Sequence, residues 1–212
     1  VTGTESLLAE RAVAERKAAA LKEQPDADVN TITADELGES MLSEVVGGSL
    51  FSSQIVAVIE DVGACPHEVV DQLVGVAKDP GPDLCLILVH GGGKKGKGLI
   101  DKLKKAKIET IPVAAVKPWE VSKFVTAEVR RHRLRIAPDA AQSLVDAVGA
   151  DLRAIVGAVS QLAGDVDGDE IDEPLIRRYF AGRAEVTSFN VADAVMAGSP
   201  SVALERLRWA LS

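Results

Sequence analysis

The run at residues 55–59 has the sequence Ile-Val-Ala-Val-Ile and is followed at once by Glu60 and Asp61. An unbroken β-branched, apolar run of this length is typical of a strand buried on both faces of a sheet. A second such run lies at 84–89, and an amphipathic helical pattern at 66–78 separates the two. Strands that alternate with helices need crossover connections, so these residues predict an α/β fold with a mostly parallel sheet.

The alternation of predicted strands and helices continues to about residue 117, and only helices are predicted after it. Thr33 with Glu36 forms a capping box, which predicts a helix from there to about residue 46. The other elements predicted before residue 117 are helices at 6–22 and 98–107 and short strands at 29–32 and 108–113. After it only helices are predicted, at 119–132, 137–149, 152–163, 173–180, 191–196 and 202–211. We therefore expect an α/β domain at 1–117, a small helical domain at 118–185 and the truncated beginning of a further helical domain at 186–212.

The composition limits the class of protein to which this chain can belong. Of 212 residues, 47% are apolar and 26% charged, which is ordinary for a globular protein. The apolar runs are far shorter than the ~18 residues of a membrane span, and the two cysteines fit a reducing compartment. We expect a cytoplasmic protein with no membrane partner, and a chain that continues beyond this sequence, since it does not begin with Met.

Charge is unevenly distributed along the chain. Residues 1–83 carry 5 basic and 16 acidic side chains, whereas 94–107 carry seven lysines and one aspartate. A second basic cluster surrounds His132. Such clusters mark either a surface that faces a polyanion or ordinary solvated helix faces, and both interpretations stay open. The candidate DNA-facing residues are Lys94, Lys95, Lys97, Lys102, Lys104, Lys105, Arg130, Arg131 and Arg133.

A nucleotide hydrolase is the main catalytic alternative. The loop Gly91–Gly98 follows a predicted strand and opens a helix, as a phosphate-binding loop does, and Glu60 with Asp61 would then hold magnesium and activate water. However, Gly98 stands where the magnesium-binding Ser or Thr is needed. We therefore favour a flexible basic loop and a solvated acidic strand end.

Metal sites are also weakly indicated. Cys65, His67, Cys85 and His90 could supply four zinc ligands, but Cys85 lies inside an apolar run, where a small buried side chain is ordinary. The aspartates from Asp165 to Asp169 lack the glycine and glutamate that a calcium loop requires. We expect no metal, no cofactor and no catalytic residue.

The segment 47–53, Gly-Gly-Ser-Leu-Phe-Ser-Ser, stands between a predicted helix and the first buried strand. Leu50 and Phe51 are either a plug that fills the core or an apolar anchor presented to a partner. A partner pocket that buries both side chains would gain roughly 3–5 kcal/mol.

In the order of its motifs, the chain resembles the delta subunit of the bacterial DNA polymerase III clamp loader. The resembling segments are residues 3–8, Ser49-Leu50-Phe51 before the strand at 55–60, and residues 86–92, 149–153 and 189–195. The resemblance implies a degenerate AAA+ α/β domain, a three-helix lid and a helical collar. It also implies a subunit without ATP hydrolysis that binds the sliding clamp through Ser49, Leu50 and Phe51 and opens one ring interface. The implied partners are the clamp, the other loader subunits and primer-template DNA. A plain nucleic-acid binder remains a third possibility.

Overall fold

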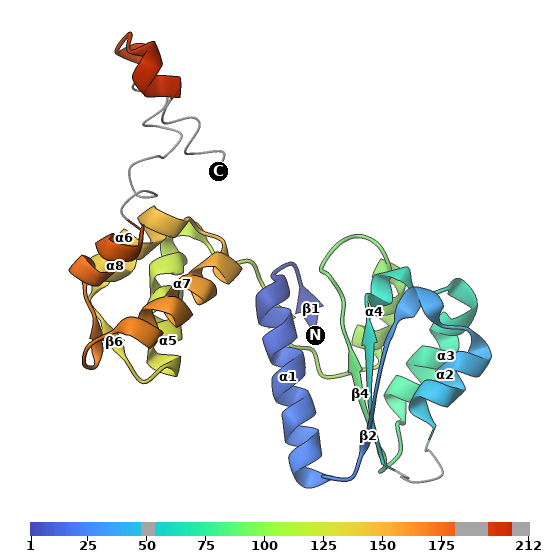
Figure 1. The fold of residues 1–212 in the computed structure, drawn as a ribbon. Helices are drawn as coiled ribbons and strands as arrows, with labels where there is room; N and C mark the ends of the chain where they lie inside the picture. The colour runs from blue at the N-terminus through green and yellow to red at the C-terminus, as the bar shows by residue number, and fades with distance from the viewer. Residues whose placement is uncertain (48–53, 181–194, 205–212) are drawn as a thin grey trace. The chain divides into compact units, whose positions relative to one another are not determined.

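The computed structural model describes residues 1–47, 54–180 and 195–204. The chain divides into two compact units, Val1–Ala115 and Val116–Ser212 (Figure 1). The first unit is built on a parallel sheet and the second consists mainly of helices.

The strand β3 (Ile55–Glu60) is the centre of a three-stranded parallel sheet. It pairs with β2 (Asp28–Thr33) on one side and with β4 (Leu84–Leu88) on the other. Residues 55–59 are all buried, as the apolar run predicts. In β4 only Ile87 is buried and the other residues are half-buried, so the prediction of a fully buried second strand is wrong. The mostly parallel sheet confirms the predicted fold class.

Two very short strands continue the sheet beyond β4. The strand β1 (Thr2–Gly3) pairs in parallel with β5 (Pro112–Val113), and Thr2 also bridges to His90 at the end of β4. The N–H of Gly3 donates to the carbonyl of His90 at 3.0 Å. Hydrogen bonding therefore gives the order β2-β3-β4-β1-β5, with the start of the chain inside the sheet.

Helices cover both faces of this sheet (Figure 1). The long helix α1 (Ser6–Glu23) packs on one face, where Val56 and Val58 of β3 meet it. The other face carries the helices α2 (Glu39–Val46), α3 (His67–Lys78) and α4 (Lys97–Lys105). Buried leucines from these three helices pack against Ile59.

The predicted helix over 33–46 is interrupted. Ala34–Glu36 form one 3₁₀ turn, Leu37 and Gly38 are extended, and α2 begins only at Glu39. The Thr33 side chain makes no capping hydrogen bond, so the predicted capping box is wrong. Ala34 and Leu37 are both buried in the core, and their burial favours the bend over a continuous helix.

Four helices make up most of the described part of the second unit, and residues 195–196 and 200–204 are also helical. The four helices are α5 (Val121–Arg131), α6 (Pro138–Val148), α7 (Leu152–Asp165) and α8 (Glu173–Phe180). The helix α5 packs on α6 and α7, and α8 packs on α6. Asp151 caps α7, because its Oδ1 accepts from the Ala154 N–H at 2.8 Å.

A short parallel pair that the sequence did not predict joins the turns between these helices. Its strands are β6 (Arg135–Ile136) and β7 (Glu170–Ile171). Across it, the guanidinium of Arg135 lies 2.8 Å from the carboxylate of Asp169, which belongs to the acidic turn after α7. Of the predicted third part at 186–212, only residues 195–204 are described. In the described residues, no helix has the length and apolar character to cross a membrane.

Gly3 provides a direct test of the sheet order. A Cβ at this position would overlap the carbonyl of Val113, whereas one at Gly98 would meet nothing within 4 Å. We predict that Gly3→Ala lowers the free energy of unfolding by at least about 3 kcal/mol, because β1 and β5 would have to separate. The matched control Gly98→Ala should leave it unchanged or raise it by up to about 1 kcal/mol. Chemical denaturation measures both, and equal stabilities would contradict the pairing.

Candidate functional site

Three parallel strands of the first unit end at one edge of the sheet. Gly3 ends β1, Glu60 and Asp61 end β3, and His90 follows β4. Open α/β sheets bind ligands at this carboxyl edge. A cavity of about 530 Å³ lies there. Its lining includes Gly3, Thr4, Glu10, Lys17, Thr33, Glu60, Asp61, His90 and Gly91.

The turn from β1 into α1 lacks the parts of a phosphate loop. Only Thr4 and Glu5 separate the strand from the helix that begins at Ser6. A phosphate loop needs several glycine-rich residues, whose amides surround the phosphates, and a lysine. Here the residue before the helix is Glu5, whose carboxylate would repel a phosphate at the helix N-terminus.

His90 organises the glycine-rich loop after β4. Its side chain is 5% exposed, and its Nδ1 lies 3.0 Å from the backbone nitrogen of Gly92. Because that N–H can only donate, Nδ1 is the acceptor, and Nε2 carries the proton that it donates to the Lys95 carbonyl at 2.8 Å. The loop therefore folds back over a neutral imidazole.

The same loop packs tightly on its neighbours. Gly92 has φ +74°, and a Cβ there would lie 2.9 Å from both Gly3 and Thr4. Gly96 has φ +72°, and its Cβ would come within 2.5 Å of Gly63. The Lys97 N–H donates to the Lys94 carbonyl at 3.3 Å. Gly91–Gly98 is thus held by internal contacts, and the N–H groups of Gly92 and Lys97 are engaged with protein atoms instead of pointing into a phosphate site.

The lysines of the glycine-rich loop are not in the lining of the cavity that holds the two acids, although the loop backbone packs close to the acidic strand end. Glu60 and Asp61 line the cavity at the carboxyl edge, but Lys94, Lys95 and Lys97 do not. Lys17 of α1 is the cation in the lining, and it shares the cavity with several carboxylates. Excess negative charge disfavours a triphosphate, so this arrangement does not support nucleotide chemistry.

The four residues considered for zinc are not combined into a site. Within the described residues, no group of three or more potential ligands is close enough to hold a metal ion. Both ring nitrogens of His90 are already hydrogen-bonded to the loop. Burial raises the pKa of the Cys65 and Cys85 thiols, which favours the neutral form over the thiolate that binds zinc.

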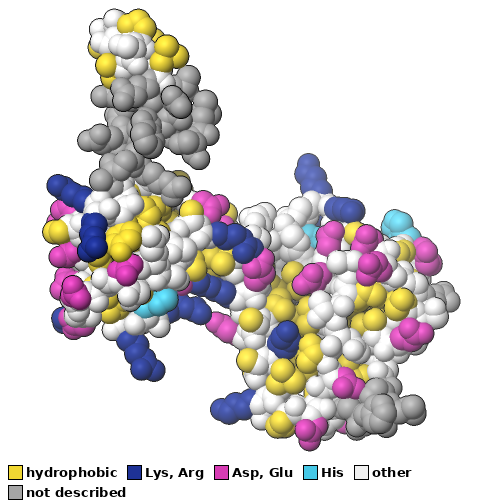
Figure 2. All heavy atoms as spheres, in the orientation of Figure 1, with side chains coloured by type: hydrophobic (Ala, Val, Ile, Leu, Met, Phe, Trp, Pro, Cys, Tyr) yellow, Lys and Arg dark blue, Asp and Glu magenta, His cyan; other side chains and the backbone are white. Residues whose placement is uncertain are grey.

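The candidate DNA-facing residues form two clusters in different units. The lysines lie in the loop before α4 and along this helix, and the arginines lie at the end of α5 and in the turn after it. All of them are exposed. Lys102 is paired with Asp71 at 2.5 Å, and this hydrogen bond lowers the pKa of the Asp71 carboxyl. Figure 2 shows acidic and basic side chains interleaved over the visible face of the second unit.

The residues predicted to bind the clamp, Ser49, Leu50 and Phe51, lie outside the described residues. Both flanks of their segment are anchored. The Asn30 side chain donates to the Val45 carbonyl at 2.9 Å, and the Asp28 N–H donates to the Gln54 carbonyl at 2.9 Å. Gly47 is required at the end of α2, because a Cβ there would lie 2.5 Å from the Ser43 carbonyl oxygen.

The structural role of His90 was missed at the level of sequence. A histidine that directly follows a buried strand and precedes three glycines was considered only as a metal ligand. The glycines were the available signal, since a loop that can approach a ring closely needs residues without side chains.

Comparison with known proteins gives a structural likeness alone. No family model and no curated protein matches the sequence. The clamp loader delta protein of Bacillus subtilis (YqeN) superposes with a TM-score of 0.70 at 15% identity, over 98% of this chain. This chain has its fold. It spans 65% of the length of that protein. The RuvB Holliday junction branch migration motor of Thermotoga maritima gives a TM-score of 0.47 at 12% identity, over 85% of this chain and 64% of RuvB.

The geometry of the edge leads to a prediction about ATP. We expect no magnesium-dependent binding of ATP, because the amides of Gly92 and Lys97 and the ring of His90 are engaged internally and the cavity is rich in carboxylates. Calorimetry with and without Mg²⁺ should detect no binding for the wild type or for Lys97→Ala. Micromolar Mg·ATP affinity that Lys97→Ala abolishes would contradict this prediction and restore the hydrolase.

Proposed function

We propose that this chain is a non-catalytic clamp-loader subunit of the delta type, which binds a replicative sliding clamp and opens one interface of the ring. The observation that carries the proposal is the fold match to a clamp loader delta protein over 98% of the chain. A carboxyl edge at which no phosphate loop is formed fits a subunit of an AAA+ assembly that does not hydrolyse ATP.

We assign clamp binding to Ser49, Leu50 and Phe51. The two anchored flanks support this assignment, since Val45 is tied to β2 and Gln54 is held at the entry to β3. A short segment held at both ends can present apolar side chains without a large loss of conformational entropy on binding. Leu50 and Phe51 would favour an open ring only by binding the distorted interface better than the closed one.

The remaining partners follow from this role. The chain would work in the cytoplasm as part of a hetero-oligomer with other loader subunits of the DNA polymerase III holoenzyme, near primer-template DNA. Residues 118–185 would then form the lid, and 186–212 would begin the collar through which the subunits assemble.

The clamp contact is tested by a double variant. Leu50→Ala with Phe51→Ala should lower clamp affinity at least ~100-fold, as expected for two buried anchors, and leave the thermal midpoint nearly unchanged. Surface plasmon resonance with immobilised clamp measures the first, and calorimetry the second. The control is Trp119→Ala, which removes a 70% exposed aromatic side chain from the second unit and should bind normally.

Two results would contradict the assignment. Unfolding of the double variant would identify the pair as a core plug, and unchanged clamp affinity would remove the residues from the interface.

DNA contact is tested by its salt dependence. We expect weak, sequence-independent binding in which each phosphate contact contributes about 0.7–0.9 to the slope of log K against log[salt]. Replacing Lys94, Lys95 and Lys97 together by Gln should reduce that slope. Lys102→Gln is the matched control and should change it little, because Lys102 is already paired with Asp71. A sequence preference that survives high salt would indicate a different kind of DNA-binding protein.

A further inference from the structure

One face of a helix in the second unit combines basic side chains with an exposed aromatic ring. The exposed residues of α5 are Lys123, Ala127, Arg130 and Arg131, and none of them is acidic. Because of their spacing along the helix, Lys123, Ala127 and Arg130 lie on one side of it. Trp119 stands one turn before Lys123, at the entry to α5, and is 70% exposed. The ring and the guanidinium group of Arg130 are therefore about 16 Å apart along the helix axis.

The turn that carries Trp119 is held by two hydrogen bonds. The Glu120 N–H donates to the Lys117 carbonyl at 2.8 Å, and the Lys117 N–H donates to the Glu120 carboxylate at 3.3 Å. Pro118 fixes the backbone directly before Trp119. The ammonium group of Lys117 lies over the indole ring, 5.4 Å from its centre. Because the ring is held in place and exposed, it can stack on another flat π-system at little cost in conformational entropy.

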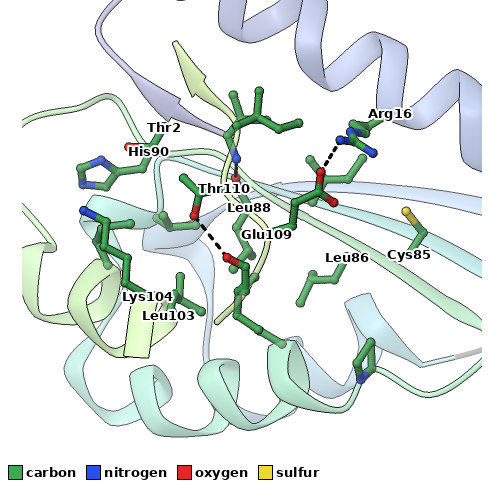
Figure 3. Close-up of a pocket in the computed structure, with 18 residues that line it drawn as sticks. Thr2, Arg16, Cys85, Leu86, Leu88, His90, Leu103, Lys104, Glu109 and Thr110 are labelled. Carbon is green, nitrogen blue, oxygen red and sulfur yellow. Dashed lines mark hydrogen bonds and ion pairs between the residues drawn. The ribbon is translucent and has the colours of Figure 1, made fainter. Parts of the chain in front are cut away.

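The cations of this face are available to an external anion. Several exposed cations elsewhere are paired with acids, as Arg16 is with Glu109 at 2.5 Å (Figure 3). Among the described residues, no ion pair joins Lys123 or Arg130 to an acid. Arg131 is the exception on this helix, since it lies 3.9 Å from a buried carboxylate. An anion that approaches Lys123 and Arg130 therefore has no internal ion pair to displace.

Arg133, directly after α5, provides an independent observation. Its φ of +62° lies in the left-handed region that glycine adopts without strain. The Arg133 N–H donates to the Arg130 carbonyl at 2.9 Å. The Leu134 N–H donates to the Val129 carbonyl at 3.3 Å, which completes a helix end of the type that usually has glycine at this position. An arginine in this strained conformation indicates that its side chain is needed there.

We propose that the basic face of α5, formed by Trp119, Lys123, Arg130 and Arg133, binds a short stretch of single-stranded nucleic acid. One base stacks on the indole ring and the three cations hold phosphates. A cationic face on a chain of net charge −8 selects a polyanion. A single strand is selected over a duplex, because unstacked bases offer a π-face to the ring whereas a duplex keeps its bases stacked inside. An acidic peptide would pair with the cations and leave the ring unused. This site goes beyond the proposed clamp contact and does not depend on it.

The fluorescence of Trp119 reports directly on this face. The chain has two tryptophans, so in a Trp209→Phe background the signal comes from Trp119 alone. Oligothymidylate or oligouridylate of about twelve nucleotides should quench it, and the stronger of the two identifies DNA or RNA as the source of the strand. A duplex of the same length, and polyglutamate of the same charge, should bind this site at least about tenfold more weakly at equal salt.

Variants separate the ring from the charges, with a labelled oligonucleotide as the probe. Trp119→Leu should lower the affinity at least about fivefold, as expected for the loss of one base stack, and Trp119→Phe should retain most of it. Replacing Lys123 and Arg130 together by Gln should reduce the slope of log K against log[salt] by about 1.4, since each single-strand phosphate contact contributes about 0.7. The matched control is Arg177→Gln. It removes a cation of the same unit that is already paired with Glu173 at 2.6 Å, so the slope should not change.

Arg133→Gly distinguishes a binding role from a purely structural one. Glycine fits the left-handed position, so the thermal midpoint should stay unchanged or rise, while the salt slope should fall by about 0.7. The matched control is Lys107→Gly, because Lys107 has φ +58° at the same type of helix end after α4. This control should affect the midpoint in the same way and leave the quenching of Trp119 unchanged.

Three results would overturn the proposal. The first is the absence of Trp119 quenching with either single strand. The second is quenching by the duplex or by polyglutamate at the same concentrations as by the single strands. The third is an affinity that stays unchanged in both Trp119→Leu and Arg133→Gly, which would leave the ring and the strained arginine with structural roles alone.

Discussion

The backbone of the first three residues connects the two parts of the sheet. Val1 hydrogen-bonds to Leu88 and His90 on one side, and Thr2 hydrogen-bonds to Ile111 on the other. These bonds place β1 between β4 and β5 and therefore bring Gly3 to the same edge as Glu60 and His90. Only a glycine fits at position 3, because a Cβ there would overlap the carbonyl of Val113. The place of Gly3 and Thr4 in the lining of the carboxyl edge depends on this pairing.

The carboxyl edge lies where α/β sheets bind nucleotides, but it lacks the loop and the cations that bind phosphates. A direct passage from β1 into α1 leaves no room for a phosphate loop, and the glycine-rich loop after β4 is folded around His90. The carboxylates of Glu60 and Asp61 face a cavity in which Lys17 is the lining cation. Such an edge lacks the groups that bind a triphosphate. The proposed function therefore depends on another segment, the one that contains Ser49, Leu50 and Phe51.

Long periodic and apolar segments made much of the fold predictable. The apolar run at residues 55–59 predicts the central strand, and the predicted bounds of α8, 173–180, are those of the structure. The strand β1 could not be predicted in the same way, because two residues carry no periodicity and their pairing depends on partners far along the chain. Of the short strand predicted at 108–113, only β5 (Pro112–Val113) is formed. The capping box at Thr33 failed because the burial of Leu37 outweighed the local signal.

The candidate site was less predictable than the fold. The sequence identifies the acidic strand end and the glycine-rich loop as two motifs. Only the structure shows that the lysines of the loop do not line the cavity that contains Glu60 and Asp61. The role of His90 depends on two hydrogen bonds that no spacing encodes. Leu50 and Phe51 lie outside the described residues, so their assignment still depends on the resemblance and on their anchored flanks.

Amide hydrogen exchange of this chain with and without a sliding clamp tests the central claim most directly. The account predicts that the clamp slows exchange in peptides that span residues 47–54 and leaves the carboxyl edge, residues 90–97, unchanged. Protection at the carboxyl edge without protection at 47–54, or no protection at all, would contradict it.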